Sequence, residues 1–233
     1  TVVAACATSA LWSCFQATGK LFQHQIPPPV EITNWAATHV PENLLAASSR
    51  AFPNSGLTLT QMAHAIRRVG LEPLVIGAPS AYGLNGVVYA YLRGKIPCIL
   101  AGQLIGNLTS QNPNLMGGHA IAITGFSLDD KAAHRLTTTG FKLRASKVEK
   151  FYGHDDQVGP FARMGWNNFQ SPIHMMHLHQ PITEALDTSW SGNVHMKPDV
   201  ILLPLYHKIR IPYSLVHDAI LALDALIENL TVN

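Results

Sequence analysis

Two side chains that lie far apart in the sequence, a thiol and an imidazole, could form a nucleophile and its base. Cys6 stands where a segment of small residues passes into an amphipathic pattern, and His119 precedes the apolar run at residues 120–123. A thiol at the N-terminus of a helix lies at the positive end of the helix dipole, which favours the nucleophilic thiolate. A histidine beside it would act as the general base. Cys6 and His119 are therefore candidate catalytic residues.

The other two cysteines have a simpler explanation. Three cysteines in 233 residues argue against a framework of disulfides and favour a reducing, cytoplasmic location. Cys98 lies in the short apolar run at residues 96–100, and Cys14 follows Cys6 by about two turns of the same predicted helix. Both are expected to be core residues. Only Cys6 combines a helix start with a distant partner base.

The composition limits the classes of partner. The chain is 47% hydrophobic and 13% charged, so it can bury a core as one large domain or as a domain with an appendage. A formal net charge of +2 without a basic stripe argues against nucleic acid. No apolar run reaches the roughly 18 residues of a membrane span, and residues 2–10 lack the charged leader of a signal peptide. No cofactor is expected, and the sequence does not define an oligomeric state.

Hydrophobic spacing predicts the elements that must position these two residues. Helices are expected over residues 6–23, 31–38, 59–69, 87–93 and 213–230, with a short helical or irregular segment over residues 41–49. In the last helix, one set of apolar residues is expected to face inward: Leu215, Ala219, Ala222, Leu223 and Leu226.

Short apolar runs predict strands in the middle and late parts of the chain. They cover residues 74–76, 97–101, 120–125, 143–148 and 150–152, with one or two further strands over residues 200–212. Helices that come first, followed by an antiparallel sheet, indicate the α+β class.

The order of these motifs resembles the papain-like cysteine peptidases. The resemblance rests on five segments: a helix opened by the cysteine at residues 6–23, a helix over residues 57–71, a strand after residues 93–97, the Gly-His-Ala-Ile-Ala-Ile-Thr-Gly strand at residues 118–125, and a strand that ends in the acidic pair at residues 155–156. Within this group the chain looks most like the double-glycine, bacteriocin-processing branch. The resemblance implies a papain-like catalytic domain over residues 1–165. Residues 166–233 would be a C-terminal extension that packs on the core or begins a second domain.

The resemblance also implies a role for each site residue. Cys6 would be the nucleophile, His119 the general base, and an Asp or Asn at the end of the next strand would hold the imidazole. Asp155 matches that third position best, and Asp156 is the alternative. An acceptor at this position would fix the tautomer of the imidazole and stabilise the imidazolium. Antiparallel pairing would carry the end of the returning strand back toward His119.

One part of the family pattern is missing from the sequence. Papain-like enzymes carry a glutamine a few residues before the nucleophile, whose amide binds the developing oxyanion, and here only residues 1–5 precede Cys6. Either this glutamine lies upstream in a longer protein, or the oxyanion hole uses the Cys6 backbone N–H and another donor. One such donor is worth about 10²–10³ in rate.

The expected activity is that of a cysteine-dependent hydrolase, most simply a peptidase. It would cleave a peptide or amide substrate through a Cys6, His119 and Asp155 triad and an acyl-enzyme. Two alternatives stay open: a catalytically silent papain-like module that binds or regulates, and an acyltransferase that uses the same thiolate with an amine acceptor.

A cluster of histidines raises the question of a metal. His174, His177 and His179 follow one another at spacings that suit neither one face of a helix nor one face of a strand, and no carboxylate or cysteine stands nearby in the sequence. The chain contains 12 histidines, so clustering by chance is the better explanation. No metal site is expected here.

Overall fold

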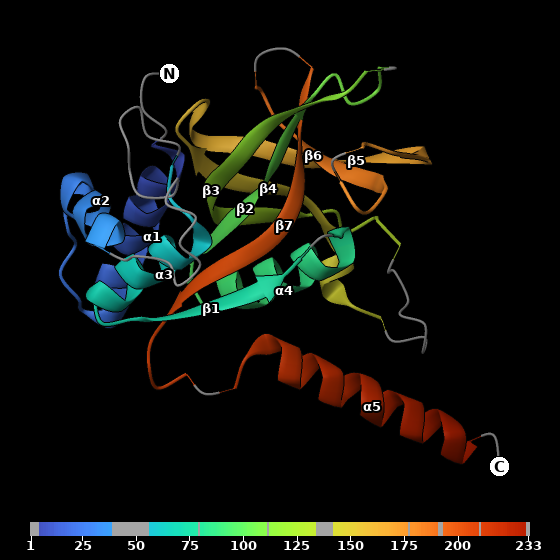
Figure 1. Cartoon of the computed structure of the whole chain (residues 1–233). Helices are drawn as coiled ribbons and strands as arrows, with labels where there is room; N and C mark the ends of the chain where they lie inside the picture. Colours follow the sequence, from blue (N-terminus) through green and yellow to red (C-terminus); the bar gives the residue numbers. More distant parts are fainter. Residues whose placement is uncertain are drawn as a thin grey trace.

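Helices and one antiparallel sheet build the α+β fold that the sequence predicted (Figure 1). The computed structural model describes residues 5–38, 56–78, 80–110, 112–133, 142–176, 178–190, 193–209 and 211–231. The helices are α1 (Cys6–Phe22), α2 (Pro29–Thr38), α3 (Leu59–Arg68), α4 (Ala81–Arg93) and α5 (Tyr213–Thr231). The strands are β1 (Glu72–Gly77), β2 (Cys98–Gly106), β3 (Asn114–Leu128), β4 (Val148–Asp155), β5 (Gly159–Ile173), β6 (Ile182–Asp187) and β7 (Val194–Leu205).

The sheet closes on itself. Its strand order is β1-β7-β2-β3-β4-β5-β6, with every neighbouring pair antiparallel. β6 also pairs with β7 through Leu186 and Met196, so six strands form a ring to which β1 adds along β7. The last strand of the sequence therefore lies between β1 and β2.

The second half of the chain belongs to the same sheet as the first half. Residue 165, where the resemblance to papain-like enzymes ends, lies inside β5. β6 and β7 follow it, and β7 pairs with both β1 and β2. The strands β5, β6 and β7 are thus integrated into the sheet, and among the described residues α5 is the one helix or strand that follows them.

Three helices gather on one side of the sheet (Figure 1). The predicted apolar face of α1 is buried, and it packs with residues of α3 and of the neighbouring strands. Thr58 begins α3 with a capping box, in which its side chain accepts from the Gln61 N–H and the Gln61 side chain accepts from the Thr58 N–H. α1 lacks such a side-chain cap at Ala5.

A second core cluster is formed by α4 and the opposite faces of the strands. Ser80 caps α4 by accepting from the Gly83 N–H, so the helix begins at Ala81 rather than at residue 87 as predicted. The cluster includes Leu84 and Val88 of α4, together with one residue from each of several strands: Ile121, Phe151, Met164, Leu186 and Met196.

The prediction for the inward face of α5 is wrong. Leu215, Ala219, Ala222, Leu223 and Leu226 are all exposed, and α5 projects from the molecule (Figure 1). The chain leaves the sheet at Leu205, and Tyr213 and His217 in the first turns of α5 form hydrogen bonds with α4. Among the described residues, no helix is both long and apolar enough to span a membrane.

Other predicted elements also need correction. Residues 143–148 are not a strand: Arg144–Lys147 form a 3-10 helix, in which the Ser146 hydroxyl donates to the Leu143 carbonyl at 2.6 Å, and β4 begins only at Val148. The strand predicted within residues 200–212 ends at Leu205. Residues 41–49 lie outside the described residues. β5 as a whole and β6 were not predicted.

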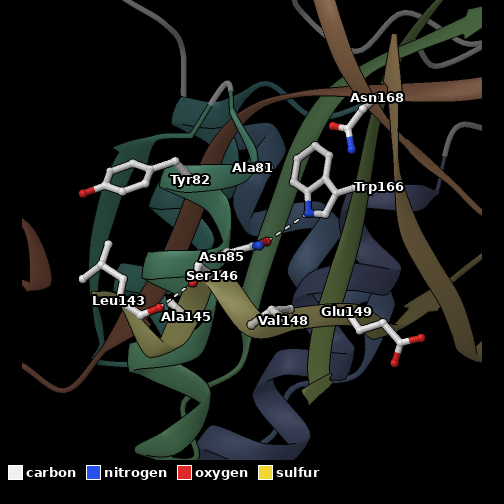
Figure 2. A pocket seen from close by; sticks show the side chains of 10 residues that line it. All are labelled: Ala81, Tyr82, Asn85, Leu143, Ala145, Ser146, Val148, Glu149, Trp166 and Asn168. Atoms are coloured by element: carbon white, nitrogen blue, oxygen red, sulfur yellow. Dashed lines mark hydrogen bonds between the residues drawn. The ribbon is translucent and has the colours of Figure 1, made fainter. Parts of the chain in front are cut away.

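A cavity of about 220 Å³ lies between α4, the 3-10 helix and β5 (Figure 2). Trp166 of β5 donates its indole N–H to Asn85 Oδ1 of α4 at 2.9 Å, which ties the helix to the sheet. None of the three candidate catalytic residues lines this cavity.

Candidate active site

Cys6 is the first residue of α1 and lies in a cleft. Its side chain is half-buried, and the cleft of about 230 Å³ is lined by both Cys6 and His119. The first N–H groups of a helix have no partner within the helix. Ala5 offers no side-chain cap to them, and the first turn of α1 contains no acidic residue. The thiol therefore lies at an uncapped, positive helix end.

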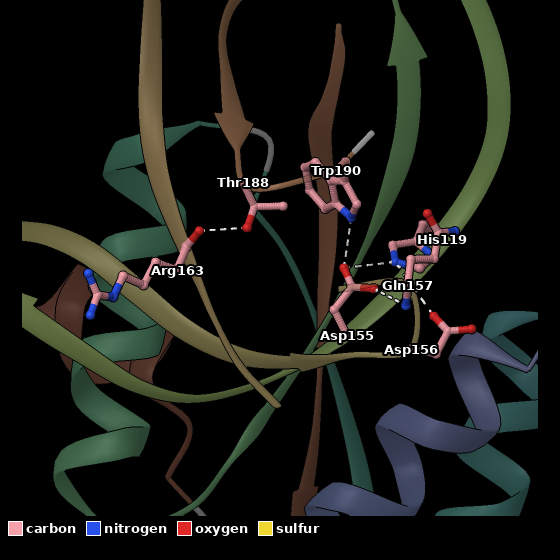
Figure 3. Close-up of polar contacts among 7 residues, drawn as sticks. All are labelled: His119, Asp155, Asp156, Gln157, Arg163, Thr188 and Trp190. Atoms are coloured by element: carbon pink, nitrogen blue, oxygen red, sulfur yellow. Dashed lines mark hydrogen bonds and ion pairs between the residues drawn. The ribbon is translucent and has the colours of Figure 1, made fainter. Parts of the chain in front are cut away.

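His119 was predicted to stand at the opening of a strand. It lies instead within β3, which begins at Asn114. It is only 4% exposed. β3 pairs with β4 in a register that places Ala122 opposite His154, so the next residue of β4, Asp155, comes beside the His119 end of β3. His119 Nε2 lies 3.2 Å from Asp155 Oδ2 (Figure 3). Because a carboxylate only accepts, Nε2 donates this bond, and the predicted contact between the two residues is present.

The Asp155 carboxylate is fully satisfied by hydrogen bonds. Its Oδ2 also accepts from the indole N–H of Trp190 at 2.8 Å, and its Oδ1 accepts from the Gln157 backbone N–H at 2.8 Å (Figure 3). Burial raises the pKa of Asp155, but the bonds from His119, Gln157 and Trp190 outweigh burial and lower the pKa below its usual value. Asp155 is therefore a fixed, ionised acceptor.

Asp156 is the more distant of the two carboxylates. Its Oδ1 lies 3.9 Å from His119 Nε2, within ion-pair distance but beyond a hydrogen bond, and its side chain is 24% exposed. Burial and the charge of Asp155 raise the pKa of Asp156, against the opposing effect of His119. The geometry thus favours Asp155 over Asp156 as the partner of the imidazole.

His119 also interacts with Cys6. Burial lowers the pKa of His119, but hydrogen bonds and charges from Asp155 and Cys6 raise it to about 9. Asp155 takes Nε2, so Nδ1 is the nitrogen available to Cys6. An imidazolium between a carboxylate and a thiol is the arrangement that stabilises a thiolate.

Trp190 covers the pair formed by His119 and Asp155. Its ring meets the imidazole edge to face, with centroids 6.3 Å apart, and it is buried itself. Sequence reasoning missed this residue. It lies in the connection between β6 and β7, and no local pattern around position 190 indicates that it reaches the site.

The other two cysteines are not placed for reaction. Cys14 and Cys98 are free thiols and fully buried. Burial raises the pKa of both, and the neighbouring Cys98 raises that of Cys14 further. Their role as core residues agrees with the two clusters in which they pack.

The cleft beside Cys6 has one apolar wall and a second part lined by small residues. Leu57, Leu59 and Met62 form the wall at the start of α3. Small residues from neighbouring strands line another part of the cleft: Ala101, Gly102, Gly118 and Ala120. The remaining lining residues are Ala7, Gly56, Gln103, Asp199 and Val200.

His119, Asp155 and Asp156 also form a group whose possible ligand atoms lie within 4.8 Å of one another. Both Asp155 oxygens already accept hydrogen bonds, so the group is satisfied as a polar network. His174 and His179 are exposed and belong to no such group among the described residues, and His177 lies outside them.

The three residues predicted from the sequence lie together at one site. Cys6 comes from α1, His119 from β3 and Asp155 from β4. Comparison with known proteins adds no assignment, because no protein-family model matches the chain and no curated protein matches its sequence significantly.

Proposed function

We propose that this protein is a papain-like cysteine hydrolase, most simply a peptidase that cleaves a peptide or amide bond. The observation that carries the proposal is the position of His119, which bonds Asp155 through Nε2 at 3.2 Å and also interacts with Cys6 at the uncapped start of α1. A helix that begins with the thiol and neighbouring strands that supply the imidazole and the carboxylate support the papain-like arrangement.

Acylation begins with the Cys6 thiolate. It attacks the carbonyl carbon of the substrate, a C–S bond forms, and the carbonyl electron pair moves to the oxygen. The backbone N–H of Cys6, at the positive end of α1, is placed to donate to this oxyanion. His119 then gives its proton to the leaving nitrogen as the C–N bond breaks. The amine departs and a thioester on Cys6 remains.

Deacylation reverses these roles with water as the nucleophile. Neutral His119 takes a proton from the water as its oxygen attacks the thioester carbon. The second tetrahedral intermediate collapses and the C–S bond breaks. The carboxylic acid product leaves, and the Cys6 thiolate is regenerated. Asp155 keeps its bond to Nε2 throughout, so the other ring nitrogen stays directed at the reacting atoms.

Limited alkylation tests the nucleophile. The folded protein is treated with limiting iodoacetamide and digested for mass spectrometry, and we expect the modification on Cys6 and not on Cys14 or Cys98. Denatured protein, in which all three thiols react, is the control for detection. Preferential modification of Cys14 or Cys98 in the folded protein would remove the basis of the mechanism.

Turnover of fluorogenic peptide amides tests hydrolysis itself. We expect activity in the native chain and none in Cys6→Ala. The Cys14→Ala variant should retain activity, provided that circular dichroism shows it to be folded. Alkylation of Cys6 without turnover of a diverse peptide library would instead indicate a silent binding module. Acyl transfer to an added amine in preference to water would indicate an acyltransferase.

A further inference from the structure

The connection between β6 and β7 carries Trp190, whose indole N–H donates to Asp155 (Figure 3). Among the described residues, β6 and β7 share one backbone pair, Leu186 with Met196, which closes the ring of strands. So short a ladder holds the connection weakly. The place from which Trp190 reaches the site therefore depends on side-chain contacts near this closing pair.

A buried histidine joins the two strands at the next step of the register. Asp187 and His195 are each one residue beyond the closing pair, so they lie opposite each other. His195 Nδ1 donates to Asp187 Oδ1, because a carboxylate only accepts. His195 Nε2 lies 2.6 Å from Asn193 Oδ1, and the residue is only 7% exposed. We call Asp187, Asn193 and His195 the β6–β7 clasp.

The clasp is tied to the neighbouring strands on both sides of the closing pair. On the β5 side, Asp187 Oδ2 accepts from Asn167 Nδ2 at 3.1 Å. On the β2 side, the Asn193 carbonyl accepts from the backbone N–H of Asn107, the residue after β2, at 2.7 Å. The clasp therefore fixes both ends of the segment around Trp190, which stands three residues from Asp187 and three from Asn193.

Apolar side chains shield the His195 ring from water. Phe169 of β5 meets this ring edge to face, with centroids 6.4 Å apart. Phe169 in turn packs on a core cluster that includes Ile105 and Ala185. Hydrogen bonds in such surroundings are stronger than in water, and leaving one of them unmade destabilises the structure around it. Loss of His195 should therefore loosen the connection that the clasp holds.

We propose that the β6–β7 clasp positions the active site, with His195 as its central residue. The clasp sets the place of Trp190, which holds the Asp155 oxygen that also accepts from His119. Without the clasp, the bond from Trp190 weakens and the imidazole is oriented less well. His195 does not line the cleft beside the thiol, so it is a positioning residue and not a catalytic one. The catalytic consequence rests on the proposed hydrolase function, whereas the effect on Trp190 does not.

Hydrogen exchange at the Trp190 indole N–H tests the clasp without a substrate. NMR of the full chain with nitrogen-15 tryptophan resolves the indole signals, and the signal lost in Trp190→Phe belongs to Trp190. We expect exchange at least about tenfold faster in His195→Ala, because the segment opens more often. His195→Asn, whose amide can donate to Asp187 as Nδ1 does, should restore slow exchange.

His217→Ala is the matched control. His217 also has both ring nitrogens engaged, by tyrosine hydroxyls at 2.7 Å and 3.3 Å, but these partners belong to α4 and α5. Exchange at Trp190 should stay slow in this variant. If circular dichroism shows His195→Ala to be unfolded, Asn193→Ala takes its place. It removes the 2.6 Å bond alone and should also accelerate exchange.

A double-mutant cycle on kcat tests whether the effect reaches the site through Trp190. We expect His195→Ala to lower kcat about fivefold with little change in KM. In a Trp190→Phe background the same substitution should lower kcat less than about twofold, because the bond it acts on is already absent. Full recovery of kcat in His195→Asn would complete the expected pattern.

Three results overturn the proposal. They are unchanged exchange at Trp190 in the clasp variants, equal acceleration in His217→Ala, and additive effects of His195→Ala and Trp190→Phe on kcat. Each of these leaves the hydrolase proposal standing when the native chain turns over substrate. A native chain without turnover would refute the hydrolase and the catalytic role of the clasp, and the exchange rates would still decide whether the clasp holds Trp190.

Discussion

Trp190 donates its indole N–H to Asp155 Oδ2 at 2.8 Å, and this oxygen is the one that also accepts the hydrogen bond from His119. The two donors fix the carboxylate from different directions, while the Gln157 backbone N–H holds the other oxygen. Trp190 does not reach the reacting atoms through these contacts. It is therefore a positioning residue, which acts on the imidazole through Asp155.

Trp190→Phe should keep the aromatic cover and lose this hydrogen bond. Because hydrogen bonds to charged groups contribute about 1.5–3 kcal/mol, we expect a comparable loss in the free energy of unfolding. We also expect kcat to fall about tenfold with little change in KM, since loss of the orienting bond affects the transition state. The acid limb of the pH–rate profile should move to higher pH, because Trp190 contributes to the lowered pKa of Asp155.

Trp166→Phe is the control for this substitution. It removes the bond to Asn85, also formed by an indole N–H, at the cavity between α4 and β5 (Figure 2). It should lower stability and leave the pH–rate profile in place. If both variants shift the profile equally, Trp190 has only a structural role.

Asp155→Asn should reduce kcat far more than Asp156→Asn. The orienting carboxylate of a triad is worth up to about 10⁴ in rate, and an amide in place of Asp155 can present its NH₂ group to His119 and select the wrong tautomer. Asp156 lies 3.9 Å from the imidazole nitrogen, so its loss should cost less than about tenfold. Steady-state kinetics on one peptide amide would decide between them. A larger effect of Asp156→Asn would move the third triad position by one residue.

Stability should decline at high pH because of His119. Its pKa in the folded protein is raised from 6.5 to about 9, so the stabilisation is complete below the ordinary pKa and is lost as pH rises through about 9. Activity should fall over the same range as the imidazolium loses the proton that it gives to the leaving group. Urea unfolding at several pH values measures the first effect, with His119→Gln as the control that should lack this decline.

The low-pH side should depend on Asp155. Its pKa is lowered in the folded protein, so its contribution is present above the ordinary pKa of 3.8 and is lost as pH falls through the lowered value. Asp155→Asn should therefore be less sensitive to acid than the native chain. Equal loss of stability in both proteins would show that other carboxylates dominate acid unfolding.

Gly153→Ala should destabilise the strand that delivers Asp155. A Cβ at Gly153 would lie 2.8 Å from Met164 Cε and 2.9 Å from the Ala122 carbonyl oxygen, which forces β3 and β4 apart. Such overpacking costs about 1–3 kcal/mol. Gly165→Ala, in the neighbouring strand β5, is the matched control because nothing lies within 4 Å of its added Cβ. Thermal unfolding measures the effect. An equal decrease in the unfolding midpoint of both variants would contradict the steric explanation.

The contact between His119 and Asp155 could be predicted because it depends on strand pairing. An apolar run that directly follows His119, a turn and a returning strand predict an antiparallel pair. In the structure the register of Ala122 with His154 brings the carboxylate to the imidazole. Trp190 could not be predicted in this way. It reaches the site through the connection between β6 and β7, and the unpredicted β6 has few local signals of a strand.

The errors in α5 and at residues 143–148 have physical causes. An amphipathic pattern shows which residues share a face, so the helix at Tyr213–Thr231 was found, but it does not show what covers that face, and Leu223 is exposed. Residues 143–148 were predicted to form a strand. The Ser146 hydroxyl instead bonds the Leu143 carbonyl and stabilises a tight turn.

The position of β7 determines when a nascent chain can complete its site. Among the described strands β1 pairs only with β7, and β7 also pairs with β2. Neither β1 nor β2 can therefore pair with β7 until the segment that ends at Leu205 has left the ribosome. Trp190 likewise emerges after Cys6, His119 and Asp155. Pairings between distant segments form late in folding. A partly synthesised chain therefore carries Cys6, His119 and Asp155 before Trp190 and β7 are there to complete the network and the sheet around them.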